Sequence, residues 1–179
     1  IQQILAGVTL DMSHYEQLYS AMSEYINELD QYMVTITGIT SNIDWFSNVQ
    51  ESENQSSGVI IANNGKELLV LADYTPIKNA ETLSLSFYNG VQVQAQIKQR
   101  DSFTNLAVIS VNLSDLPEKD RDDLIKIASL GSSNVKNLVS TPVIAVGSPM
   151  GSSHSIGYGM ITAVSSQLSV TDRNYKLLL

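Results

Sequence analysis

The fold class is decided by one stretch, Leu83-Ser84-Leu85-Ser86-Phe87-Tyr88-Asn89-Gly90-Val91-Gln92-Val93-Gln94-Ala95-Gln96-Ile97. Apolar and polar residues alternate on both sides of its centre, which is the period of a β-strand with one buried face. The pair Asn89-Gly90 is favoured at the two positive-φ positions of a type I′ turn, so the stretch predicts a hairpin with that turn. The side chains expected to face the core are Leu83, Leu85, Phe87, Val91, Val93, Ala95 and Ile97.

Four further strands are predicted around this hairpin, from runs rich in β-branched residues. They cover residues 33–38, 57–62, 68–71 and 106–111. Together with the hairpin they give six short antiparallel strands between residues 32 and 112, which is typical of a closed barrel or a sandwich.

Residues 113–127 interrupt the strand pattern with Pro117 and a cluster of charged residues, and they predict a solvated connection with a short helix. Strands are predicted again at 142–147, 156–165 and 175–179, within a second unit covering residues 128–179. Three strands leave unpaired edges and cannot close a barrel, so we expect this second unit to be incomplete within the sequence.

The N-terminal segment, residues 1–31, predicts an amphipathic helix. Ser13 and Glu16 have the spacing of a capping box, and apolar residues then recur at three- and four-residue steps. We expect this helix to pack on the first barrel through Leu18, Met22 and Leu29. A role in oligomerisation or as a membrane-proximal stalk stays open, and so does the oligomeric state.

Composition narrows the function classes. Ten basic and eighteen acidic residues give a net charge of −8, which argues against nucleic-acid binding. There is no cysteine, and no metal-ligand spacing or phosphate-binding glycine loop is found, so we expect no cofactor and no metal. The chain begins at Ile1 rather than Met, so we expect a processed or excised piece whose only membrane attachment would be an upstream anchor.

Five short phrases occur in a fixed order along the chain. They are SSGVII at 56–61, RDSFTNLAVI at 100–109, ASLGSS at 128–133, VIAVGSPMG at 143–151 and YGMITA at 158–163. Over residues 32–179 this order resembles the HtrA/Deg-like group of trypsin-type, chymotrypsin-fold serine peptidases. The resemblance implies an all-β fold of two six-stranded antiparallel barrels, a peptide or protein ligand, and an extracytoplasmic location at the cell surface or a membrane.

The same resemblance places the catalytic residues, and this sequence departs from the family there. The position of the family's His is occupied by Thr75, or by Tyr74 if the match slips by one residue, and the position of its Asp by Asn105. The family's nucleophilic serine would follow Leu179. Asp73, two residues before Thr75, is interpreted as a turn-capping residue or as an additional acid near the cleft.

A Thr hydroxyl has no pKa near neutrality and cannot take the proton of a serine, while an Asn cannot stabilise an imidazolium. The sequence therefore predicts a pseudopeptidase that has kept the fold as a peptide- or protein-binding or regulatory module. Two alternatives stay open. One is an active serine endopeptidase with a base from elsewhere, for which His154 is the candidate, and the other is a structural or assembly domain.

Overall fold

The computed structural model describes residues 12–43, 49–132, 138–147, 155–170 and 173–178. Its helical elements are α2 (Met12–Leu29), η1 (Asp30–Tyr32), η2 (Thr75–Ile77), η3 (Leu113–Asp115) and α3 (Arg121–Leu124). The strands are β1 (Met33–Ile43), β2 (Val49–Asn63), β3 (Glu67–Asp73), β4 (Thr82–Phe87), β5 (Gln92–Asp101), β6 (Leu106–Asn112), β7 (Pro142–Gly147), β8 (Ser155–Met160), β9 (Ser165–Val170) and β10 (Arg173–Leu178). No helix in the described part of the chain is both long and apolar enough to span a membrane.

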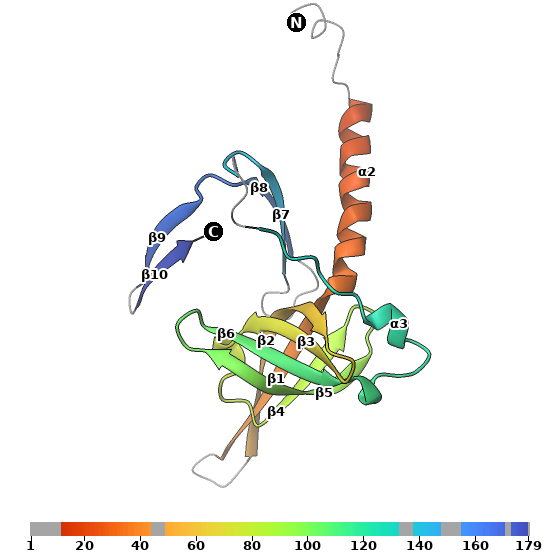
Figure 1. The fold of residues 1–179 in the computed structure, drawn as a ribbon, viewed down its shortest axis with the longest axis vertical. Helices are drawn as coiled ribbons and strands as arrows, with labels where there is room; N and C mark the ends of the chain where they lie inside the picture. The colour runs from red at the N-terminus through yellow and green to blue at the C-terminus, as the bar shows by residue number, and fades with distance from the viewer. Residues whose placement is uncertain (1–11, 44–48, 133–137, 148–154, 171–172, 179) are drawn as a thin grey trace, which may run out of the picture.

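The first six strands form a closed antiparallel barrel, as the alternation predicts (Figure 1). The strand order around the barrel is β1-β2-β3-β6-β5-β4. Alternate residues of each strand point inward, and the fully buried side chains include Ile36, Ile60, Leu68, Val70, Leu85 and Ile109. Burial of these branched apolar side chains is the main force that closes the barrel.

Gly58 of β2 is closely surrounded by side chains of this core. A Cβ atom at Gly58 would lie 2.5 Å from Val70 Cγ1 and 2.9 Å from Ile36 Cδ1. The barrel interior is packed to the density of an organic crystal, so no space is available for even one methyl group. A glycine is therefore required at this position of β2, which lies between β1 and β3 in the barrel.

The turn between β4 and β5 differs from the expected type I′ turn. Gly90 has a φ of 83°, but Asn89 is not among the residues with positive φ. The Gly90 N–H donates to the Phe87 carbonyl at 2.9 Å, and the Phe87 N–H donates to the Val91 carbonyl at 2.9 Å. This is the three-residue loop in which a type I turn is followed by one left-handed residue, and Asn-Gly fits it as well.

The prediction of which hairpin residues face the core is confirmed for five of them, which are all buried: Leu83, Leu85, Phe87, Val93 and Ala95. Val91 is only partly buried against the core. Ile97 was expected inside and is 36% exposed. Ile97 pairs with the fully buried Ile109 and is the last residue of β5 before the register against β6 shifts, so the alternation holds as far as Ile97 but its side chain is only partly covered.

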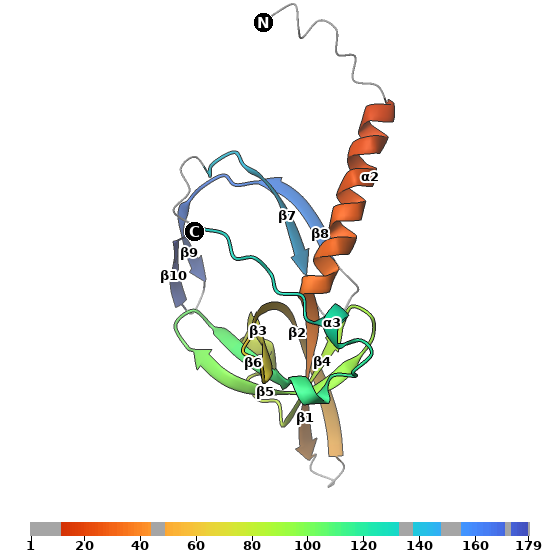
Figure 2. The same cartoon turned by 45° about the vertical axis from the view of Figure 1, so that its right-hand side comes forward.

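The N-terminal helix forms, but it begins at Met12, so Ser13 lies inside its first turn rather than at the N-cap. The helix does not lie along the barrel as expected. Figures 1 and 2 show α2 rising away from the barrel, on the side where β7 and β8 lie. In its second half Ile26 is buried and Met22 and Leu29 are half-buried, while the side chain of Leu18 lies outside the described residues.

The side of α2 that was expected to meet the barrel instead borders a groove and a second strand pair. The groove has a volume of about 400 Å³ and is lined by residues that include Tyr25, Leu29, Val59, Ile127 and Ile144. Farther along the helix, the ring of Tyr19 meets the ring of Tyr158 of β8 edge to face, with centroids 6.4 Å apart. The helix thus connects the first barrel to the β7–β8 pair.

The second unit contains four described strands where three were expected, because the predicted strand 156–165 is interrupted after Met160. β8 ends there, and β9 begins at Ser165. The strands form two separate antiparallel pairs, β7 with β8 and β9 with β10. No closed second barrel is formed among the described residues, as the sequence predicts.

Candidate functional site

The first half of the candidate site is the turn that leaves β3. The Asp73 carboxylate accepts the Thr75 N–H on Oδ1 at 3.0 Å, which closes a turn typical of Asp before a helix. Ser56 Oγ donates to the Asp73 carbonyl at 3.1 Å from the adjacent strand β2. Thr75 then begins η2, whose last residue, Ile77, is fully buried. Asp73 before it and the buried Ile77 after it thus fix the backbone at Thr75, whose side chain is exposed at the barrel end.

The second half is the loop between β5 and β6. Asp101 accepts the Phe103 N–H at 2.9 Å and the Thr104 hydroxyl at 2.8 Å. These two hydrogen bonds hold the pKa of Asp101 below its ordinary value. Asn105 follows with a φ of 60°, a left-handed conformation that Asn tolerates better than most residues. The backbone conformation of the loop thus sets the direction in which the half-buried Asn105 side chain extends.

The two halves meet through Asp73. The Asn105 side-chain Nδ2 donates to Asp73 Oδ1, the oxygen that also accepts the Thr75 N–H. The Tyr74 N–H donates to the Asn105 carbonyl at 2.9 Å, so the two loops are also joined through the backbone. The structure therefore brings Thr75 and Asn105 to one corner of the first barrel, and the link between their loops runs through the Asp73 carboxylate.

A second contact that the sequence did not predict joins the same two loops. Arg100 Nη1 donates to the Tyr74 hydroxyl at 2.6 Å, and the guanidinium carbon lies 5.3 Å from the centre of the Tyr74 ring. The Arg100 guanidinium thus contacts the Tyr74 hydroxyl and ring rather than the Asp73 carboxylate. The only sequence signal for Asp73 was its place two residues before Thr75. Arg100 was noted only as the first residue of the phrase at 100–109, and its contact with Tyr74 could not be predicted because the two residues lie 26 positions apart in the chain.

The corner can donate and accept hydrogen bonds, and none of the described residues brought together there is a histidine. Its groups are a hydroxyl, an amide, a guanidinium, a phenol and a carboxylate, one oxygen of which already accepts two hydrogen bonds. His14 lies on α2, and His154 lies outside the described residues. In the described part of the chain, no group of three or more His, Cys, Asp or Glu side chains is placed to hold a metal ion.

Comparison with known proteins agrees with this architecture. A family model described as a trypsin-like peptidase domain matches residues 56–177. The serine protease Do-like HtrA of Bacillus subtilis (strain 168) is 29% identical over 163 residues, covering 85% of this chain and 34% of that protein. The protein of the same name from Lactobacillus helveticus is 30% identical over 132 residues, covering 72% of this chain and 30% of that protein.

A solved structure shows the same fold. It is described as "HtrA-type protease AlgWS227A with decapeptide", and it matches with a TM-score of 0.66 and 17% sequence identity over 86% of this chain and 48% of that one. The chain spans about a third of the length of the two HtrA relatives named above. The family match covers more than half of the chain, from residue 56 in β2 to residue 177 in β10. The chain therefore belongs to the trypsin-like peptidase domain family and is an HtrA-like, trypsin-fold member of it.

Proposed function

We propose that this HtrA-like domain does not hydrolyse peptide bonds and acts as a peptide- or protein-binding or regulatory module. The observation that supports the proposal is that Asp73 Oδ1 accepts hydrogen bonds from both the Thr75 N–H and the Asn105 side-chain amide. In the matched family a serine is activated by an imidazole that an Asp orients, and here a hydroxyl and an amide stand at those two positions. A Thr hydroxyl cannot accept a serine proton at neutral pH.

The binding part of the proposal rests on the fold and on the structural relative. That relative is described with a decapeptide, and the barrel that would carry one wall of a peptide site is complete here. Loss of the acid and the base does not remove backbone groups that pair with an extended peptide. We further propose that the domain works outside the cytoplasm, as its resemblance to HtrA-like proteins implies.

The direct test is activity-based labelling of the full-length protein with a fluorophosphonate, together with hydrolysis of casein. We expect neither labelling nor hydrolysis, and we expect denatured casein to bind without being cut. Strong labelling that disappears when a single serine is substituted would contradict the proposal. Loss of that labelling in His154→Ala would then identify the substitute base.

A restoration series tests the role of each position. Asn105→Asp alone would place a second carboxylate against Asp73, and Asp73→Asn removes that repulsion. The variant to make is therefore Asp73→Asn with Thr75→His and Asn105→Asp. Its matched control carries Asp73→Asn and Thr75→His but keeps Asn105. If a serine nucleophile is supplied, the triple variant should exceed this control by up to about 10⁴-fold in turnover. This is the loss in turnover that follows when the catalytic Asp of a trypsin-type peptidase is replaced by Asn.

A further inference from the structure

The sequence contains two Asn-Gly pairs, Asn64-Gly65 and Asn89-Gly90. A glycine that follows an asparagine leaves its own amide nitrogen sterically free to attack the side-chain amide, because it has no Cβ. Both pairs lie in turns between barrel strands, and the glycines have similar φ values of 84° and 83°. The two sites therefore share sequence and glycine conformation, and they differ in what holds the side-chain amide.

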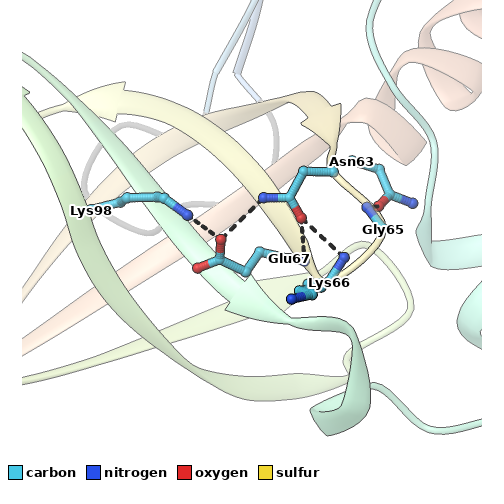
Figure 3. Close-up of polar contacts among 6 residues, drawn as sticks. Asn63, Gly65, Lys66, Glu67 and Lys98 are labelled. Atoms are coloured by element: carbon cyan, nitrogen blue, oxygen red, sulfur yellow. Dashed lines mark hydrogen bonds and ion pairs between the residues drawn. The ribbon is translucent and has the colours of Figure 1, made fainter.

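The amide of Asn64 is held on both of its ends. Its Oδ1 accepts the Lys66 N–H at 3.0 Å and the Glu67 N–H at 2.7 Å. Its Nδ2 donates to Glu67 Oε2 at 3.1 Å. The attacking nitrogen is also occupied, since the Gly65 N–H donates to Asn63 Oδ1 at 2.8 Å (Figure 3). Rotation of this amide toward the Gly65 nitrogen would break three side-chain hydrogen bonds together.

Glu67 is itself fixed in place. Its Oε2 is paired with the Lys98 ammonium of β5, as Figure 3 shows. The hydrogen bonds from Lys98 and Asn64 hold the pKa of Glu67 below its ordinary value, so the carboxylate stays ionised at neutral pH. An ionised acceptor makes the stronger hydrogen bond to Asn64 Nδ2. The barrel wall thus stabilises the Asn64 amide through Glu67 and Lys98.

The amide of Asn89 is held at one point only. Its Oδ1 accepts the Val91 N–H at 3.1 Å. The Gly90 N–H donates to the Phe87 carbonyl at 2.9 Å, which is the bond that closes the turn. Within the part of the chain that the structure describes, Asn89 Nδ2 has no acceptor. Both turns are hairpin tips, and the one whose asparagine is held by a single side-chain hydrogen bond opens more readily than the one held by three, so the bonds at Asn89 are the first to be lost.

We infer that Asn89 is a site of spontaneous deamidation and that Asn64 is protected from the same reaction by Glu67 and Lys98. At Asn89 the Gly90 nitrogen loses its proton and attacks Asn89 Cγ. The new C–N bond forms as ammonia leaves, which gives a cyclic succinimide. Water then opens the ring to aspartate or isoaspartate. Either product adds a negative charge, and isoaspartate also lengthens the backbone in the turn that Phe87 and Val91 close.

The test is incubation of the folded chain in mildly alkaline buffer, followed by peptide mapping with mass spectrometry to separate Asn, Asp and isoAsp at both sites. Asn64 must release two more side-chain hydrogen bonds than Asn89, so we expect Asn89 to convert at least about tenfold faster. In denaturant the two rates should approach each other. Equal rates in the folded chain, faster conversion at Asn64, or no conversion at Asn89 would overturn the inference.

Two variants assign the protection. Glu67→Ala removes the acceptor of Asn64 Nδ2 and the partner of Lys98, and it should accelerate conversion at Asn64 several-fold. Glu67→Gln keeps an acceptor oxygen and should have a smaller effect. Asn89 serves as the internal reference, because a variant that merely unfolds would accelerate both sites. Acceleration at Asn64 alone supports the inference, and an unchanged Asn64 rate in Glu67→Ala contradicts it.

Discussion

Asn105 Nδ2 donates a hydrogen bond to Asp73 Oδ1 across the end of the first barrel, between residues that are 32 positions apart in the chain. The same oxygen accepts the Thr75 N–H. One carboxylate thus connects the two loops that in the HtrA-like family would carry the catalytic His and Asp. The most direct predictions concern this contact.

Asn105→Asp should destabilise the folded domain at neutral pH. The variant puts a second carboxylate where an amide now donates to Asp73, and like charges at that distance raise the folded-state pKa of one carboxyl above its unfolded value. The penalty should therefore be present above the raised pKa and should shrink as pH falls through it toward the unfolded value. Urea unfolding of parent and variant as a function of pH measures this. Asp73→Asn in the same chain is the control and should remove the pH dependence.

Asn105→Ala and Asn105→Gly separate the hydrogen bond from the backbone conformation. Both lose the bond to Asp73, which should cost about 1 kcal/mol. Only alanine also meets the steric cost of a φ of 60°, roughly another 1 kcal/mol. We expect Asn105→Gly to be the more stable of the two variants in urea unfolding. Equal stabilities would indicate that the loop can leave the left-handed conformation.

Asp101 should contribute to loss of stability in acid. Its folded pKa is lowered by the Phe103 N–H and the Thr104 hydroxyl, so its stabilising effect is present above the unfolded pKa and is lost as pH falls through the folded value. Asp101→Asn should therefore unfold with a weaker pH dependence in the acid range. Identical acid profiles for parent and variant would show that these hydrogen bonds do not favour the ionised form.

Gly58→Ala should be destabilising, by about 1–3 kcal/mol, because the added methyl group overlaps Val70 and Ile36 inside the barrel. Gly131→Ala is the control, since no described residue lies within 4 Å of the position of its added methyl group. Urea midpoints of the two variants give the comparison. A Gly58→Ala variant as stable as Gly131→Ala would show that the barrel interior can yield at this point.

The contact between Tyr19 and Tyr158 should couple the helix to the second strand pair. A double-mutant cycle with Tyr19→Ala and Tyr158→Ala is expected to give a coupling free energy of about 0.5 kcal/mol, at the low end for an edge-to-face pair because both rings are partly exposed. Additive effects of the two substitutions would mean that α2 and β8 do not depend on each other in solution.

The barrel strands could be predicted from the sequence because a period of two is a local property. Each residue from Leu83 to Ala95 has its side of the sheet fixed by its neighbours, and the buried residues agree with that pattern. The prediction that Ile97 is buried was wrong because how completely a side chain is covered depends on the rest of the barrel and not on the alternation within β5 alone. The predicted type of the turn at Asn89-Gly90 was wrong because Asn-Gly suits both a two-residue type I′ loop and a three-residue loop.

The candidate site divides in the same way. The sequence by itself predicts, from motif order along the chain, that Thr75, or Tyr74 if the match slips by one residue, occupies the His position and Asn105 the Asp position, and this assignment stays a prediction. Only the tertiary structure decided that Asp73 joins them and that Arg100 is engaged by Tyr74, because these contacts form between loops brought together by the pairing of β3 with β6. Likewise, an amphipathic pattern determined that α2 is a helix, but its partner surface depended on where the chain placed β7 and β8. Local periodicity follows from backbone geometry, whereas contacts between distant loops follow from the packing of the whole barrel.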